Sequence, residues 1–375
     1  MTPGIMALLE EKKVIVCCGA GGVGKTTVSA ALALAAARAG RRVLVVTIDP
    51  SKRLAETLGV QRNAREPIRL SAERLEAAGV RGDLWAWMLD PKQVSDDVVR
   101  TFSKTEAQGK RLLENPIYRN VTAMVAGMQE YTAVEALHGF VQSCRYDLVI
   151  LDTPPSRDAL RFLEAPVRAS AFLDRRIFNL FMPGEGGVIR RVATKLLERV
   201  MDAAFGKNTR IQLQEFFELF GSLLGHLNRN QTEMRGFFSD PSVGFMLVTA
   251  PTQDALSEAM FFEQKTEQVL GMHVSGYVLN RSLARQGGAR VATDQDLDAN
   301  ADAVIRRAVA KLKPLAERER VLVDGHVELA NQLIGHAGED GVVWVAPAMP
   351  EGVNTLPQLI RLADAMLDAK GEDSQ

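Results

Sequence analysis

Short apolar runs recur along the chain, separated by stretches long enough to hold a helix. The runs are continuous rather than alternating, which is typical of strands buried on both faces of a parallel sheet. The pattern predicts strands at Val14–Cys18, Val43–Ile48, Leu84–Leu89, Asp147–Leu151, Gly244–Thr249, Val274–Leu279 and Val342–Ala346. Strands that alternate with helices favour the α/β class, with a mostly parallel central sheet flanked by helices.

Helical patterns fill several of the intervals between these strands. One runs from about Lys25 to Ala39 and stops at Gly40, a residue suited to ending a helix. A long helical stretch is predicted from about Lys92 to Cys144, and an amphipathic one at Leu356–Lys370. Residues 1–13 are expected to form a short leader before the first strand.

The interval from Ala165 to Asp240 breaks the alternation, because it has a helical pattern and no convincing strand. It is rich in phenylalanine, and the rings either pack a core of their own or line a groove for an apolar client or a partner subunit. The adjacent pairs Phe216-Phe217 and Phe237-Phe238 slightly favour a groove, since neighbours on a helix cannot both face one narrow stripe. We expect one domain over residues 1–375, with a core at about 14–91, 145–164 and 241–370 and a helical insertion at about 92–144 and 165–240.

Composition narrows the classes of function. A formal net charge of −1 and the lack of a long basic block disfavour sequence-independent binding of nucleic acid. No apolar run reaches the roughly 18 residues that span a membrane, so we expect no integral membrane segment and a cytoplasmic protein. Cys17 and Cys18 should be buried thiols on opposite faces of a strand, and with Cys144 they form no C-x-x-C zinc pair.

The stretch Gly19–Thr26 carries the first chemistry. It matches G-x-x-x-x-G-K-[ST], the loop whose backbone N–H groups cradle a polyphosphate between a strand and a helix. Lys25 is expected to reach the β- and γ-phosphates of a nucleotide, and the Thr26 hydroxyl to hold Mg²⁺. The residues predicted to bind the nucleotide here are Gly21, Gly22, Val23, Gly24, Lys25, Thr26 and Thr27.

Aspartates stand at the ends of three predicted strands, where ligands of a parallel sheet bind. Asp152 is predicted to act on Mg²⁺ directly or through water, and Asp49 to position or deprotonate the attacking water. Thr26, Asp49 and Asp152 thus form the predicted metal site, and Lys25, Asp49 and Asp152 the predicted catalytic group. Asp90 is expected to be a structural residue of a turn.

These segments resemble a known family of ATPases. Gly-Gly-Val-Gly-Lys-Thr-Thr at 21–27 is similar to the deviant phosphate loop of the arsenical pump-driving and guided-entry (tail-anchored protein targeting) ATPases. Ile48–Leu54 resembles the first switch of that family, in which the residue matching Asp49 is catalytic. Asp152–Leu163 resembles its second switch, where the residues matching Asp152 and Thr153 would sense the γ-phosphate.

Further matches extend the resemblance over nearly the whole chain. Gly127–Glu130 is similar to a segment of the family's helical region. Val278–Arg281 resembles its adenine-reading strand end, which implies that Asn280 reads the base. Ala346–Val353 resembles the segment that packs beside the base, which implies roles for Pro347 and Met349.

The departures from the family pattern bear on partners and turnover. Ala20 replaces a lysine that, in the family, reaches across a face-to-face dimer to the partner's nucleotide, and a methyl group cannot stabilise negative charge. A lysine-bearing paralogue in a heterodimer, a low turnover or a substitute cation would each account for this. Lys52 and Arg53 are candidates for that cation, although solvated basic residues are the plainer interpretation.

Other departures concern metals and clients. Asp158 replaces a family histidine, the zinc-binding C-x-x-C pair is missing, and the dispersed cysteines disfavour an arsenite site. The five histidines have no metal-ligand spacing.

The sequence therefore predicts an ATP-binding, Mg²⁺-dependent ATPase that forms ADP and phosphate and couples nucleotide state to a protein or membrane-protein client. A dimer, homo- or heteromeric, is expected. Two alternatives remain open. One is a targeting factor that binds hydrophobic segments, and the other is a low-turnover nucleotide-binding subunit that pairs with a related ATPase.

Overall fold

The structure is a computed structural model of the chain. It describes residues 4–48, 53–60, 64–103, 105–116, 118, 128–165, 206–209, 211–212, 215–216, 233, 236–285, 303–338 and 341–367.

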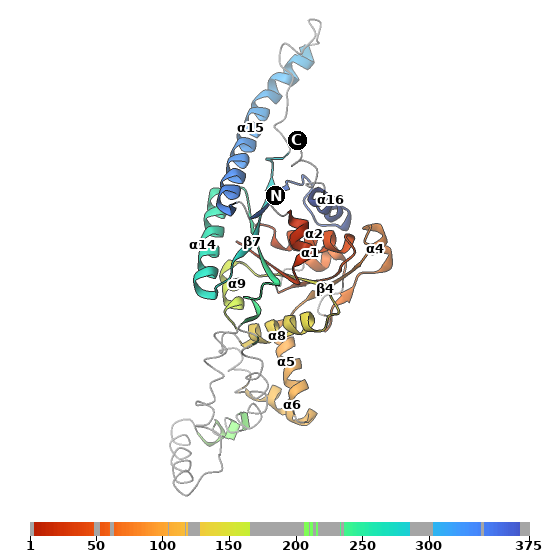
Figure 1. Ribbon diagram of the computed structural model, residues 1–375, viewed down its shortest axis with the longest axis vertical. Helices are drawn as coiled ribbons and strands as arrows, with labels where there is room; N and C mark the ends of the chain where they lie inside the picture. The colour runs from red at the N-terminus through yellow and green to blue at the C-terminus, as the bar shows by residue number, and fades with distance from the viewer. Residues whose placement is uncertain are drawn as a thin grey trace. The chain divides into compact units, whose positions relative to one another are not determined.

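The described strands form one eight-stranded sheet in the order β3-β4-β2-β5-β1-β6-β7-β8 (Figure 1). Every neighbouring pair is parallel except β3 and β4, which are antiparallel. The strands are β1 (Val14–Cys18), β2 (Arg42–Thr47), β3 (Ile68–Arg69), β4 (Asp83–Met88), β5 (Leu148–Asp152), β6 (Val243–Thr249), β7 (Val274–Ser282) and β8 (Val342–Pro347).

Helices cover both faces of this sheet (Figure 1). Helix α2 packs on β2 and β5 and is covered by α16, whereas α14 packs on β6 and α15 on β7. The described helices are α1 (Ile5–Glu11), α2 (Lys25–Arg38), α3 (Arg53–Leu58), α4 (Ala72–Ala77), α5 (Pro91–Phe102), α6 (Glu106–Glu114), α8 (Met128–Gln142), α9 (Ser156–Leu163), α14 (Gln253–Leu270), α15 (Ala303–Ala337) and α16 (Leu356–Leu367).

The core lies around β1 and α2. All five residues of β1 are buried between β5 and β6, as a continuous apolar run in the middle of a parallel sheet requires. Helix α2 is rich in alanine and is buried on nearly every side, because it lies between the sheet and α16. Its small side chains let the helix approach the strands closely. The loop at 19–24 joins its first turn to the end of β1.

The predicted α/β class is confirmed, and the predicted strands are present with ends that differ by at most three residues. One expectation was wrong: the N-terminal segment includes a helix, α1, rather than being only a leader. Ile5, Leu8 and Leu9 of α1 are buried, so this short helix contributes apolar side chains to the core. The short edge strand β3 was missed, because two residues carry no readable alternation.

The chain divides into two compact units. The first contains Met1–Met88, Ser143–Ala159 and Pro241–Gln375, and the second contains Leu89–Gln142 and Leu160–Asp240. The sheet belongs entirely to the first unit.

In the second unit, Asp90 accepts hydrogen bonds from the backbone N–H groups of Lys92 and Gln93 at 2.9 and 3.2 Å. It therefore caps α5, the structural role expected of it.

Most of the phenylalanine-rich interval lies outside the described residues. The three of its rings that are described, Phe216, Phe237 and Phe238, are all buried. Phe237 packs edge-on against His138 and Phe238 packs edge-on against Phe162, within the second unit. For these three rings the core interpretation holds, and the adjacency of Phe237 and Phe238 does not indicate a groove. Phe217 lies outside the described residues.

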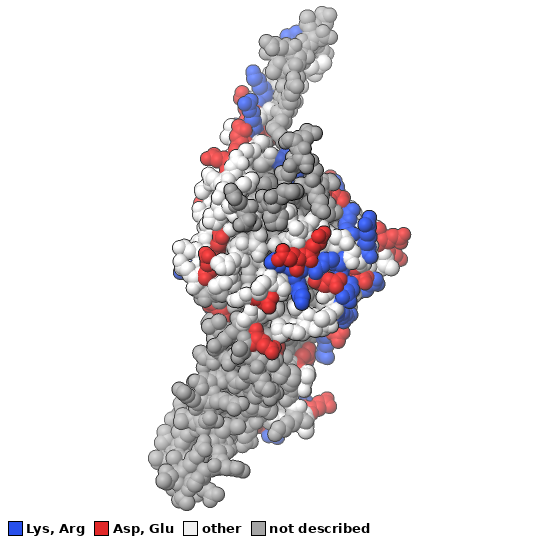
Figure 2. All heavy atoms as spheres, viewed as in Figure 1, with Lys and Arg blue, Asp and Glu red and all other residues white. Residues whose placement is uncertain are grey.

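Charged side chains of both signs lie side by side on the visible face of the first unit (Figure 2). Several form ion pairs that join elements: Arg38 with Asp364 links α2 to α16, and Arg69 with Asp83 links β3 to β4. Arg42 donates to Asp147 at 2.7 Å, and this guanidinium holds the pKa of the Asp147 carboxyl below its usual value.

Among the described helices, none combines the length and the apolar character that crossing a bilayer requires.

The three cysteines divide into two classes. Cys17 belongs to the core cluster on the α2 side of the sheet, and Cys18 faces the opposite side near Thr153. Burial raises the pKa of both thiols, that of Cys18 to about 12. Cys144 is exposed.

We therefore expect a disulfide-exchange reagent at pH 8 to modify one thiol quickly in the native protein and all three in denaturant, because the thiolate is the reactive form. A Cys144→Ser variant should lose the fast phase. Fast reaction of two or three thiols in the native protein would contradict the buried placement of Cys17 and Cys18.

Candidate nucleotide site

The candidate site lies at the carboxyl ends of the strands, where β1 runs through residues 19–24 into α2. The strands beside β1 are β5 and β6, with β2 beyond β5 and β7 beyond β6. Residues at the ends of β2, β5 and β7 therefore surround the loop, as is usual for ligand sites of open α/β sheets.

At two positions of the loop an added Cβ would overlap atoms of neighbouring strands. Gly19 has φ 149°, and a Cβ there would overlap the carbonyl oxygen of Val248 on β6. Gly24 has φ 92°, and a Cβ there would overlap the side-chain amide of Asn280. Gly21 differs, because its nearest neighbour would lie 3.9 Å from an added Cβ.

Lys25 lies across the loop rather than in solvent. Its side chain is buried, and Nζ donates to the carbonyl oxygens of Gly19 at 3.1 Å and Ala20 at 2.8 Å. The ammonium group and the N-terminus of α2 both present positive charge on this side of the loop, which suits a polyphosphate.

A buried carboxylate stands beside the first turn of α2. Oδ2 of Asp152 accepts hydrogen bonds from the hydroxyls of Thr26 at 2.7 Å and Thr47 at 2.8 Å. Asp152 and Thr47 are almost completely buried, so the carboxylate depends on these hydroxyls for solvation.

Strand register explains how these groups meet. Asp152 is paired with Cys17 on β1 and with Thr47 on β2, so that three neighbouring strands end at the same level. The role of Thr47 was missed in the sequence, where it is one β-branched residue in an apolar run. Its position just before Ile48-Asp49 was the available signal.

The donor set suits Mg²⁺, which prefers hydroxyl, carboxylate and water oxygens. Thr26 and Asp152 are the described residues that would hold the ion. Asp49 lies outside the described residues, so its predicted place in the metal and catalytic groups stays a prediction.

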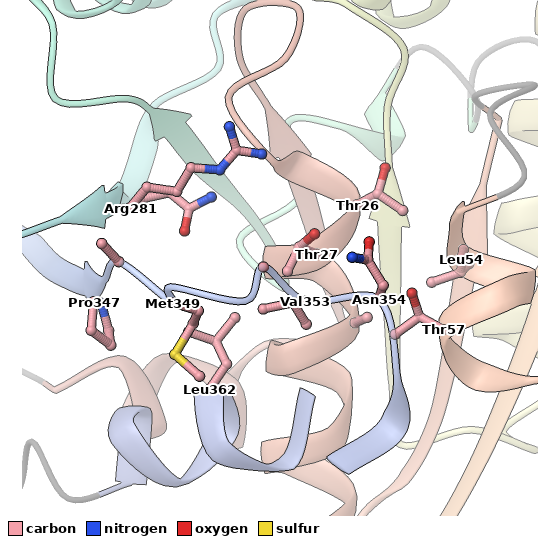
Figure 3. Close-up of a pocket in the computed structure, with 14 residues that line it drawn as sticks. Thr26, Thr27, Leu54, Thr57, Arg281, Pro347, Met349, Val353, Asn354 and Leu362 are labelled. Carbon is pink, nitrogen blue, oxygen red and sulfur yellow. The ribbon is translucent and has the colours of Figure 1, made fainter. Parts of the chain in front are cut away.

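A cavity of about 410 Å³ opens from the first turn of α2 toward β8. Figure 3 shows side chains from separate segments facing this space, with Thr26 and Thr27 on one side and Pro347 and Met349 on another. The full lining is Thr26, Thr27, Ala30, Leu54, Thr57, Asn280, Arg281, Pro347, Ala348, Met349, Gly352, Val353, Asn354 and Leu362.

The cavity has a polar end and an apolar end. Thr26 and Thr27 are at the phosphate-loop end, whereas Met349, Val353 and Leu362 offer apolar surface for a flat base. Val353 lies in the segment expected to pack beside the base. Leu362, together with Leu54 and Thr57 of α3, was missed, since nothing in a sequence marks which residues face a cavity.

Asn280 is buried at the junction of loop and cavity. Its Nδ2 donates to the carbonyl oxygen of Val23 at 2.8 Å, and no other hydrogen bond of this side chain is found among the described residues. Oδ1 can therefore accept from a ligand, as the exocyclic amine of adenine would require.

Ala20 is buried within the core cluster and does not face open solvent. Of the two cations considered as substitutes for the family lysine, Lys52 lies outside the described residues. The side chain of Arg53, at the start of α3, is also not described.

The sequence profile described as Anion-transporting ATPase matches residues 12–295. The chain belongs to this family. The resemblance stated from the loop and the two switches is thereby confirmed.

Among curated relatives, the chain is 26% identical over 221 residues to ATPase GET3 of Malassezia globosa, covering 58% of this chain and 55% of that protein. It is 24% identical over 217 residues to the putative arsenical pump-driving ATPase 1 of Aquifex aeolicus, covering 55% of this chain and 48% of that protein. It is 31% identical over 192 residues to protein Rv2184c of Mycobacterium tuberculosis, covering 48% and 44%. The chain thus spans about half the length of these relatives.

Gly19, where a Cβ would overlap β6, and Gly21, where a Cβ has room, should respond differently to substitution by alanine. Gly19→Ala should lower the free energy of unfolding by roughly 3 kcal/mol or more, because the methyl group must displace backbone of β6. Gly21→Ala, its matched control, should change the free energy of unfolding by about 0.5 kcal/mol or less. Denaturant titrations of both variants test this, and equal stabilities would contradict the loop geometry.

Proposed function

We propose that the protein is a Mg²⁺-dependent ATPase that hydrolyses ATP to ADP and phosphate. The observation that carries the proposal is the contact between Thr26 and Asp152 beside the phosphate loop. It supports the proposal because a hydroxyl and a buried carboxylate beside this loop would suit a triphosphate with its metal ion, and a merely structural glycine turn would not need them.

In this proposal, each group has a defined task. Lys25 and the loop N–H groups bind the β- and γ-phosphates, and Asn280 with Pro347 and Met349 holds the adenine. Thr26 and Asp152 would hold Mg²⁺, and the bound ion would supply positive charge against the phosphates. Asp49 orients the attacking water and accepts its proton, while Thr153 senses whether the γ-phosphate is present.

The main test is phosphate release from Mg·ATP by the purified chain. Asp49→Asn should lower kcat by about 100-fold or more, the usual contribution of a positioned base, while ADP still binds. Lys25→Ala should lose nucleotide binding. Wild-type protein that binds no ATP, or an Asp49→Asn variant with full activity, would overturn the proposal.

The position of Ala20 bears on a second part of the proposal, an ATP-dependent dimer that is homomeric or pairs with a related ATPase. Particle size of the purified chain, measured with ADP and with a non-hydrolysable ATP analogue, tests whether ATP causes the chain to form a homodimer. In the same assay, Ala20→Lys is compared with Ala20→Met, which adds similar bulk without charge. Activation by lysine alone would support the low-turnover interpretation, and equal activities would show that charge at this position does not matter here.

We further propose that the nucleotide state is coupled to a protein or membrane-protein client. The support is that the chain passes from Thr153 almost directly into α9, which begins in the first unit and ends in the second. At the start of α9, the Ser156 hydroxyl donates to Glu258 of α14 at 2.6 Å, so this end is anchored to the first unit. The expected cytoplasmic location stays a prediction.

This coupling predicts a change in hydrogen exchange. Peptides from residues 165–240 should exchange differently with ADP and with a non-hydrolysable ATP analogue, because the second switch leads into that unit. The Lys25→Ala variant, which should not bind nucleotide, serves as the control and should show no difference. Identical exchange in the wild-type protein would contradict the coupling while leaving the ATPase proposal intact.

A further inference from the structure

Arg281 stands in an unusual backbone conformation at the edge of the nucleotide cavity. It follows Asn280 near the end of β7 and has φ 60°, in the left-handed region that favours glycine. Cys144 is the other non-glycine residue with positive φ among those the structure describes. Residues held in such conformations are concentrated at functional sites, because the surrounding structure must compensate for the strain.

The side chain of Arg281 reaches the phosphate loop. One terminal guanidinium nitrogen, Nη2, lies 3.7 Å from the point where a Cβ on Gly24 would be. In Figure 3 the side chain extends from the end of β7 toward the start of α2, where Thr26 and Thr27 line the same cavity.

The guanidinium carries a charge that the described part of the protein leaves unbalanced. Arg281 is exposed, and none of the described carboxylates forms an ion pair with it. It stands beside the N-terminus of α2, which is itself the positive end of the helix dipole. Two positive groups that face one space repel each other unless an anion lies between them.

The geometry of the cavity indicates which anion fits. Arg281 lines the same cavity as Pro347 and Met349, and its guanidinium lies beside Gly24 of the loop. A nucleotide with its base against Pro347 and Met349 and its terminal phosphates on the loop would therefore bring a group between base and terminal phosphates within reach of Arg281. The group at that point is the phosphate nearest the ribose. We propose that Arg281 binds the α-phosphate of the nucleotide within the same chain, an inference that rests on the proposed nucleotide site.

This role supplies charge for nucleotide binding but does not replace the transition-state charge of the lysine that Ala20 lacks. The chain supplies a second cation to the phosphates from β7, without a partner subunit. Because ATP and ADP share the α-phosphate, Arg281 contributes to binding both and does not discriminate between ground state and transition state. Its loss should therefore raise KM and leave kcat nearly unchanged.

The test compares Arg281→Gly with Arg281→Lys and with Arg285→Ala, a control that removes a nearby exposed arginine outside the cavity. Arg281→Gly should bind ADP about 10- to 100-fold more weakly, as expected for loss of a charge-assisted contact, and Arg281→Lys should recover part of this. Arg285→Ala should bind as the wild type does. Since glycine relieves the backbone strain, the thermal midpoint of Arg281→Gly should not fall.

Two further ligands test whether Arg281 contacts the α-phosphate rather than the terminal phosphates or the base. Magnesium pyrophosphate, which can occupy the loop alone, should bind Arg281→Gly and wild type equally. Adenosine, measured by displacement of a fluorescent ADP analogue from each protein, should also bind equally.

Unchanged ADP affinity in Arg281→Gly, or equal losses for ADP and either control ligand, would overturn the inference. If instead the wild-type protein bound no ADP, the proposed function itself would fail.

Discussion

The Asp152 carboxylate is the group on which the site depends most. It is completely buried, and one of its oxygens is held by hydroxyls from α2 and β2. An ionised carboxylate in an apolar interior is costly unless hydrogen bonds replace its water. The pairing of Thr26 and Thr47 with this oxygen therefore fixes the first turn of α2 against two strands, and the phosphate loop takes its position from that junction.

A second constraint acts from the other side of the loop. Gly19 touches the backbone of β6, and Gly24 touches the Asn280 side chain, which in turn donates to Val23. The loop is thus held between β5 on one side and β6 and β7 on the other. The polar end of the cavity is therefore fixed by contacts to three strands, whereas its apolar end includes Met349 and Val353 from the segment after β8.

Membership of the anion-transporting ATPase family accounts for the shared features of the site, and the differences lie in its charges. Ala20 is buried where the family pattern has a lysine, whereas Arg281 is exposed at the cavity edge with a strained backbone. A cation on another strand of the same chain, here β7, could act on a nucleotide without assembly of a dimer.

Local patterns were enough to predict most of the fold. Continuous β-branched runs, the glycine pattern of the loop and the aspartates at strand ends determined the parallel sheet, the phosphate loop and the importance of Asp152. These features were readable because each depends on residues adjacent in the chain. Helix α1 and strand β3 were not, since segments so short are stabilised by the core they touch and not by their own periodicity.

Only the tertiary structure decided which distant residues complete the site. Thr47 meets Asp152 because two strands share a register, and Arg281 faces the loop because β7 lies two strands from β1. The choice of Gly19 and Gly24 over Gly21 as the sterically demanding positions depends in the same way on neighbours from β6 and β7. The sequence by itself thus determined the kind of site, and packing between strands decided its members, because contacts across a sheet leave no regular spacing along the chain.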